Sequence, residues 1–409
     1  MAYGEQWNAY TAFKAQAGKG AQATGAGALV LPESGGQGGR MTKAAIESGL
    51  VRQDGMQRRG RHGSQKTSGA YNGELIVGAT DPIFEAIMRG NWSPADLSIT
   101  EADMTSITTT EHTIVAAAGD WIAKGLRVGD VIRLVDQDLA NADLNIRISG
   151  LSATTITTPD TLVPNAVADT DFAVVRKGRK LINPGPGQLL RRYFTVEEHE
   201  YDLDASELFT DCMFSRLRIA MAADGNVTTE LGWTGTGQFE TKLGAQAPFF
   251  PAPADPVGVP MAALEASLRV GTQDLIDLTS FDVTIDLQAS TPSVTGPSKY
   301  APDVFLGTMA VSMNLTVLRK DLLAVADFIN EQPLSLHFLA GTNPETGPAD
   351  FFSLAVPNFT YGAVDKSAVA KAGGARTETR TVPTALVGID ERGGAYDRTM
   401  IKIQVSNAA

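Results

Sequence analysis

The sequence predicts a mainly β protein: two β-sandwich or barrel domains, each with a short flanking α-helix, plus a small inserted β-barrel-like module. Three observations support this fold class. Several segments alternate strictly between apolar and polar residues, as half-buried strands do. A strand followed by a short helix occurs twice, at residues 71–92 and 313–333. Between these copies, residues 111–178 contain short β-branched runs separated by glycines.

The composition is that of a globular protein without disulfides. The 409 residues exceed the usual size of one domain, and they are 43% apolar and 20% charged. We expect neither a membrane span nor a cleaved leader, because no long apolar run or signal-peptide pattern is present. The only cysteine, Cys212, excludes an internal disulfide and a cysteine-based zinc site, and the four histidines are scattered. We therefore expect no metal and no cofactor.

Residues 1–66 are predicted to form an extended arm with a basic end. Residues 1–70 contain nine Lys/Arg and four Asp/Glu, a net +5, whereas the remainder contains 25 and 42, a net −17. The Gly/Ala-rich stretch 16–40 cannot bury enough apolar surface to become ordered alone. The basic run 57–66 indicates a solvated loop or a contact with an acidic neighbouring surface. The acidic body argues against tight nucleic-acid binding.

The first strand–helix copy has clear helix boundaries. Asp81 is a suitable N-cap, Pro82 occupies the favoured first helical position, and Gly90 offers a stop. The expected buried stripe consists of Ile83, Phe84 and Ile87. A second structural signal in this half is the segment 215–233, which reads as a hairpin that turns at Asp224-Gly225.

The second half repeats these patterns. In residues 281–287, Val283, Ile285 and Leu287 alternate with Asp282, Thr284 and Asp286, which predicts a half-buried strand with an acidic face. In the second helix, Asp321 can cap and Pro333 ends the segment. Its expected buried face consists of Leu322, Val325, Phe328 and Ile329. A last alternating strand covers residues 399–406.

Aligning Asp81 with Asp321 also aligns Leu75 with Leu315 and Val77 with Val317, which indicates an internal repeat. The predicted organisation follows from this repeat. The arm is residues 1–66, the first domain is 67–110 with 179–255, the module is 111–178, and the second domain is 256–409.

Motifs for chemistry are incomplete. The stretch 17–20 resembles part of a phosphate loop but lacks its first glycine and its Ser/Thr. Residues 136–143 and 202–211 lack the glycine and glutamate of calcium loops. Residues 197–201 surround His199 with carboxylates, which could form a general base or a metal site, but an acidic strand face is the favoured interpretation. We expect no enzyme activity and no catalytic residue.

Six segments together resemble bacteriophage tail tube proteins, the major tail proteins of long-tailed phages. They cover much of residues 60–340: "SGAYNGELIVGATDPIFEAIMRGNW", "GDWIAKGLRVGDVIRLVD", "YFTVEEHEYDL", "FSRLRIAMAADGNVTTELGWTGTG", "TSFDVTIDLQ" and "FLGTMAVSMNLTVLRKDLLAVADF". The resemblance implies a structural virion protein that self-assembles into stacked rings, through which DNA passes into the host without specific binding. Two tube domains per chain suggest a trimeric ring with pseudo-six-fold symmetry, and a hexamer remains open.

The resemblance also implies locations and partners. The protein would belong to the virion tail, be assembled in the host cytoplasm, contact no membrane, and meet tape measure and tail tip or terminator proteins. Lumen-lining candidates are Asp282, Thr284 and Asp286. Candidates for contact between rings are Arg52, Arg58, Arg59, Arg61 and Lys66. The alternatives are a head–tail connector or another ring-forming virion protein, a carbohydrate-binding adhesin, and last a hydrolase built around His199.

Overall fold

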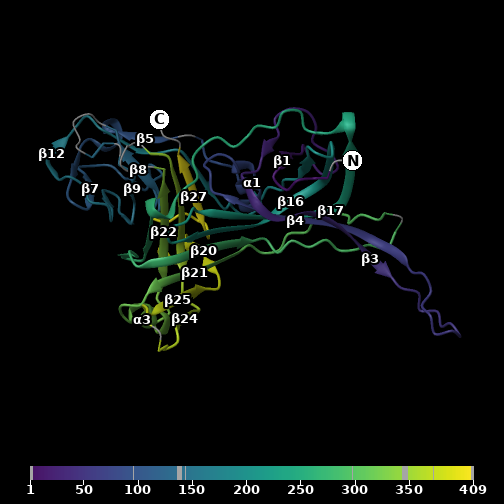
Figure 1. Ribbon diagram of the computed structural model, residues 1–409. Coiled ribbons are helices and arrows are strands. Elements are labelled where there is room, and N and C mark those ends of the chain that lie inside the picture. Colours follow the sequence, from purple (N-terminus) through teal and green to yellow (C-terminus); the bar gives the residue numbers. More distant parts are fainter. Residues whose placement is uncertain are drawn as a thin grey trace.

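The computed structural model describes residues 3–94, 96–135, 141–142, 144–296, 298–342, 349–371 and 373–406. The described part of the chain is mainly β, with four antiparallel sheets and four short α-helices. Figure 1 shows a large sheet that runs through the body, a second sheet packed against it, and a separate β module at one end. A long hairpin projects from the opposite end.

The large sheet has eleven strands. One path runs β2 (Leu29–Val30), β1 (Ala9–Ala15), β15 (Phe194–Glu200), β16 (Ala205–Ala222), β20 (Leu278–Asp286), β21 (Ala310–Leu318), β25 (Thr377–Val382) and β24 (Ala363–Lys366). A branch from β16 runs through β17 (Thr228–Leu243) and β4 (Arg61–Glu74) to β3 (Glu33–Ile46). The predicted hairpin is confirmed as β16 and β17, with Asp224 at a positive φ in its turn.

The second sheet has seven strands and packs on the large one. Its order is β14 (Arg179–Ile182), β27 (Lys402–Ser406), β23 (Phe351–Phe359), β22 (Leu334–Gly341), β18 (Ala266–Val270) and β19 (Gln273–Asp274), with β26 (Ala385–Leu386) beside β23. Phe281 of the large sheet meets Phe338 of the second at 5.5 Å between ring centroids, inside one shared core. Burying apolar side chains from both sheets is the main stabilising contribution to this sandwich.

The inserted module begins at Leu97, earlier than the predicted residue 111. Its first strand β5 (Leu97–Thr100) pairs with β13 (Ala173–Arg176), followed by β8 (Val131–Leu134) and β9 (Ile146–Arg147). The other sheet is β10 (Gly150–Leu151), β11 (Thr155–Thr157), β7 (Thr113–Ala116), β6 (Ile107–Thr109) and β12 (Asn165–Asp169). The predicted start of the module is too late because β5 pairs with a strand more than 70 positions away. A local sequence pattern cannot indicate that pairing. The module has its own apolar core around Trp121.

Buried charges connect the module to the body. Asp130 of the module accepts hydrogen bonds from Lys402 Nζ at 2.7 Å and Lys180 Nζ at 3.3 Å. Both lysines also donate to Asp397, from Lys402 at 3.1 Å and from Lys180 at 3.2 Å. The set of two acids and two bases is therefore neutral in sum. Burial would raise the pKa of Asp130, but the two lysines outweigh it and lower that pKa to about 2.

The two predicted helices differ in burial. In α1 (Asp81–Met88) the N-cap is Thr80, so the expectation for Asp81 was one residue late, and Asp81 forms an ion pair with Arg179 instead. In α3 (Leu323–Ile329) only Ala324 is buried, so the expected buried face of Leu322, Phe328 and Ile329 was wrong. The remaining helices are α2 (Glu101–Met104), α4 (Gly388–Arg392) and the 3-10 turns Gly244–Gln246 and Ala263–Glu265.

The predicted arm 1–66 consists of two different parts. Residues Ala9–Ala15 form β1, which pairs with β15 inside the large sheet, and Phe13 is buried in the core. Residues 33–74 form the β3–β4 hairpin, whose outer part projects from the body (Figure 1). Only this second part is an extension, because β1 gains its partner from a segment about 185 residues away, Phe194–Glu200.

Candidate functional site

The large sheet has one buried and one polar face. On β20, Phe281, Val283 and Ile285 point into the core, which leaves Asp282, Thr284 and Asp286 on the other, half-exposed face. The predicted alternation of this strand is confirmed, and the three candidate lumen residues share one face. The same face continues over the neighbouring strands of the sheet, because all of their pairings are antiparallel and keep a regular register over Arg216–Ala220 of β16 and Ser280–Asp286 of β20.

The polar face is not uniformly acidic. Arg218 on β16 lies 3.7 Å from Asp282, and Arg216 lies 3.4 Å from Glu230 on β17. Asn314 on β21 donates to Asp282 at 3.3 Å. On β3, Arg40 lies opposite Ser68 and donates to its hydroxyl at 3.3 Å. Short polar side chains occupy much of the rest of the face: Ser68, Asn72, Thr228, Thr234, Ser280, Ser312, Thr316, Thr379 and Thr381. Arg216 and Arg218 therefore each already have a carboxylate neighbour on the adjacent strand.

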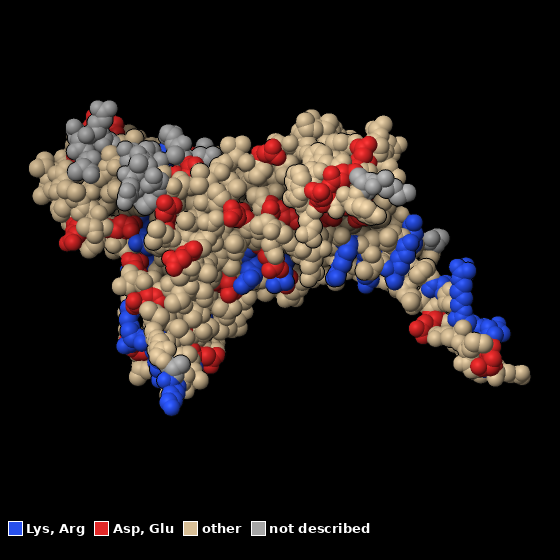
Figure 2. Space-filling model, viewed as in Figure 1, with Lys and Arg blue, Asp and Glu red and all other residues tan. Residues whose placement is uncertain are grey.

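Sequence reasoning missed the two arginines on this face. The signal was present, because Arg216 and Arg218 alternate with Leu217 and Ile219, which are buried. What the sequence could not provide was the register between β16 and β20, which brings Arg218 opposite Thr284 and next to Asp282. Figure 2 shows Lys and Arg side chains along the hollowed lower surface of the molecule and on the projecting hairpin.

Four of the five basic candidates lie in one segment. Arg52, Arg58, Arg59 and Arg61 belong to the hairpin tip, which we define as residues 46–61. Arg61 is the first residue of β4, and Lys66 is exposed farther along that strand, opposite Thr42 of β3. In the tip, Arg52 pairs with Asp54, and the Met56 backbone N–H donates to the Asp54 carboxylate at 3.1 Å. The tip is therefore held in part by hydrogen bonds among its own residues.

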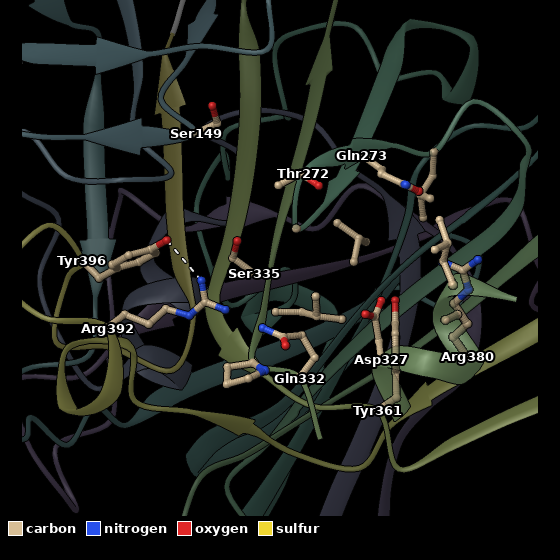
Figure 3. Close-up of a pocket in the computed structure, with 17 residues that line it drawn as sticks. Ser149, Thr272, Gln273, Asp327, Gln332, Ser335, Tyr361, Arg380, Arg392 and Tyr396 are labelled. Carbon is tan, nitrogen blue, oxygen red and sulfur yellow. Dashed lines mark hydrogen bonds between the residues drawn. The ribbon is translucent and has the colours of Figure 1, made fainter. Parts of the chain in front are cut away.

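A cavity of about 410 Å³ lies beside α3 (Figure 3). Arg392 and Tyr396 are on one side, joined by a 3.2 Å hydrogen bond, and Asp327, Tyr361 and Arg380 are on the other. Ser335 and Gln332 lie between them. The lining mixes both charges with aromatic rings and contains no nucleophile paired to a base. It has the size of a small-ligand site but no arrangement that selects one class of ligand.

The carboxylate cluster around His199 is structural. Glu197 is fully buried and accepts hydrogen bonds from Ser206 Oγ at 2.6 Å, from Phe249 N at 2.5 Å and from Phe250 N at 2.9 Å. The Ser206 hydroxyl also lies 3.0 Å from His199 Nδ1. Since the serine hydroxyl donates to a carboxylate that also holds two backbone amides, this cluster fixes the chain at Phe249–Phe250.

No group of three or more His, Cys, Asp or Glu side chains in the described part of the chain is placed to hold a metal ion. None of the helices described here has the length and apolar character needed to cross a membrane.

Comparison with known proteins gives one finding. A family model described as phage tail tube protein matches residues 8–384, which is nearly the whole chain. The match includes the hairpin, the inserted module, both helices and the strands of the polar face. No curated protein matches the sequence.

Proposed function

The chain belongs to the phage tail tube protein family, and from this premise we propose that copies of it form stacked rings around a channel for DNA. It is a structural component of the virion tail.

The observation that carries the ring proposal is a repeat within the large sheet. Eight strands lie side by side in the order β3-β4-β17-β16-β20-β21-β25-β24. In the first four, a hairpin (β3–β4) is followed by a helix (α1) and then by a second hairpin (β16–β17). In the last four, a hairpin (β20–β21) is followed by a helix (α3) and then by a second hairpin (β24–β25). The two sets therefore have the same connectivity and the same spatial order.

The repeat predicts how a ring closes. Within one chain, the last strand of the first set, β16, pairs antiparallel with the first strand of the second set, β20. Among the described strands, β24 pairs only with β25 and β3 pairs only with β4, so each has an unpaired edge. Placing β24 of one copy beside β3 of the next repeats the β16–β20 junction with the same antiparallel sense. Three chains would give six repeats per ring, and a six-chain ring is the alternative.

The polar face is proposed to line the channel, with Asp282, Thr284 and Asp286 among the lining residues. Nucleic-acid affinity arises largely when unpaired cations displace counterions from phosphates. On this face Arg216 and Arg218 already have carboxylate neighbours, which supports passage of DNA without tight binding. The lining expected from the sequence was acidic, and the arrangement of the strands favours a balanced one.

The basic hairpin is proposed to connect copies of the chain. Complementary charge fixes register and accelerates association. Arg52, Arg58, Arg59, Arg61 and Lys66 would contribute to such contacts. Assembly would take place in the host cytoplasm, and tape measure, tail tip and terminator proteins would be the partners at the channel and at the ends.

Negative-stain electron microscopy of the concentrated protein tests the proposal. Hollow tubes whose end-on views have three chains per ring support both the tube and the repeat. Six chains per ring keep the tube and refute the use of the repeat, whereas closed single rings favour a connector. The first variant to compare is a deletion of residues 47–60, because removal of residues 1–66 would also delete β1. The expected result is a folded protein that forms no tubes, and normal tubes would contradict a role for the hairpin.

A further inference from the structure

The helix α3 has an apolar surface that its own chain leaves uncovered. Leu322 is 62% exposed, Leu323 50%, Phe328 40% and Ile329 72%. Four large apolar side chains on one two-turn segment are costly to leave in water, and exposed apolar patches of this kind usually mark contact sites. The surface that these four residues form is called the α3 surface below.

The equivalent helix α1, in contrast, is covered by its own chain. With Asp81 aligned to Asp321, Ile83 corresponds to Leu323 and Met88 to Phe328, and both residues of α1 are completely buried. The segment that returns from the module lies against α1: Leu190 N donates to Arg89 O at 3.0 Å, and Arg192 pairs with Glu85 at 3.2 Å. In the second repeat the chain runs from Ile329 directly to β22 at Leu334 and supplies no such segment. A cover for α3 must therefore come from another chain.

Charge indicates what kind of segment would fit. Residues 321–332 contain Asp321, Asp327 and Glu331 and no Lys or Arg, a net −3. Within the described part of the chain, no ion pair involves any of these three carboxylates, whereas the preceding Lys320 is already paired with Asp277. The α3 surface thus combines apolar side chains with unneutralised negative charge, and it would attract an apolar segment that carries free cations.

The hairpin tip has the complementary properties. Residues 46–61 contain four arginines and two acids, a net +2, and expose Ile46, Leu50, Val51 and Met56. Arg58, Arg59 and Arg61 have no carboxylate partner among the described residues, because Asp54 is paired with Arg52 and Glu47 accepts from Gln57. The tip and α3 lie at opposite ends of the molecule in Figure 1, so the tip cannot reach α3 of its own chain.

From these observations we infer that the α3 surface is the docking site for the β3–β4 hairpin of a second copy of this chain. The apolar side chains of the tip would cover Leu322, Phe328 and Ile329, and its arginines would face Asp327 and Glu331. The 410 Å³ cavity beside α3, with Leu323 and Asp327 in its wall, can accept one of the tip side chains (Figure 3). Because donor and acceptor are different surfaces, the contact propagates from copy to copy. The inference deepens the proposed function and rests on it.

Disulfide trapping tests the contact directly, since the native Cys212 is buried and does not interfere. Ile329→Cys is combined in the full chain with Ile46→Cys or with Val51→Cys. The matched control combines Ile329→Cys with Val167→Cys, on the module, where the side chain is 77% exposed. Under mild oxidation we expect covalent multimers from at least one hairpin pair, formed at least ten-fold faster than in the control. Equal rates, or no multimers from either hairpin pair, would overturn the inference.

Charge reversal provides the second measurement. Arg58→Glu with Arg59→Glu should reduce assembly at least ten-fold, and adding Asp327→Lys with Glu331→Lys should restore it. Arg58, Arg59 and Glu331 are exposed and Asp327 is half-buried, so circular dichroism should report unchanged folding. Tubes that form without any hairpin crosslink would refute this contact and leave the proposed function standing. Hairpin crosslinks in closed single rings would support the contact and refute the stacked tube. If the wild-type chain stays monomeric and neither hairpin pair forms a crosslink, both the contact and the proposed function are contradicted.

Discussion

Asp130→Asn should strongly destabilise the junction between the module and the body. The substitution removes one negative charge from a buried set that is neutral as a whole, and leaves Lys180 and Lys402 with Asp397 alone. In the wild-type protein Asp130 and Asp397 outweigh the effect of burial and raise the pKa of Lys402, whereas burial lowers the pKa of Lys180. Removing one partner of a buried pair leaves an uncompensated charge, which costs about 3–5 kcal/mol.

The lowered pKa of Asp130 gives a second measure of how much its carboxylate stabilises the fold. A decrease from 3.8 to about 2 corresponds to about 2 kcal/mol of stability that the carboxylate contributes when ionised. The folded-state pKa is the lower one, so this contribution is fully present above pH 3.8 and is lost as the pH falls toward 2. The difference in unfolding free energy between wild type and Asp130→Asn should therefore shrink by about this amount in acid.

Equilibrium urea unfolding followed by tryptophan fluorescence measures the effect, because Trp121 is completely buried in the module core. The matched control is Asp96→Asn, which breaks an ion pair with Lys177 at the same junction. That pair is 2.9 Å long but partly exposed, and exposed pairs contribute less than about 1 kcal/mol. Equal destabilisation by the two variants, or a loss below about 1 kcal/mol for Asp130→Asn, would refute this account of the buried network.

Three further outcomes follow from packing. Gly69→Ala should destabilise the fold by about 1–3 kcal/mol in thermal unfolding, because a Cβ there would lie 2.5 Å from Nε1 of Trp233. Gly49→Ala, with nothing within 4 Å, is its control, and equal melting temperatures would contradict the clash. Cys212 should resist iodoacetamide until denaturant is added, because burial raises the pKa of its thiol; rapid labelling in buffer would show that the site opens. His199→Ala should cost about 1 kcal/mol through its lost hydrogen bond and leave assembly unchanged, and a folded variant that forms no tubes in micrographs would oppose that view.

Strands with one solvent-exposed face could be predicted from the sequence, whereas strands with two buried faces were harder to predict. β20, much of β17 and the last part of β16 alternate because one side packs on the second sheet and the other meets solvent. In β23 and β27 every residue is buried, so Lys402 and Gln404 lie inside although their positions alternate with Ile403 and Val405. The partners of those polar side chains come from the module, which no local pattern could indicate.

The candidate site was predicted in part for a related reason. The alternation in β20 was enough to assign Asp282 to a polar face, but its partner Arg218 depends on long-range strand register. The apolar residues of α3 predict a buried face, because amphipathicity indicates that a helix needs a partner. It does not indicate which chain supplies that partner, and here Leu322 and Ile329 are exposed to solvent.

The uninterrupted run of eight strands has a mechanical consequence for a tail made of this chain. Both halves share one hydrogen-bonded sheet through the β16–β20 junction, and one apolar core lies behind it. Shearing or hinging one half against the other would break a ladder of backbone hydrogen bonds and expose that core. A tail that curves would therefore have to bend at the interfaces between chains, with each chain behaving as a rigid unit in a flexible tube.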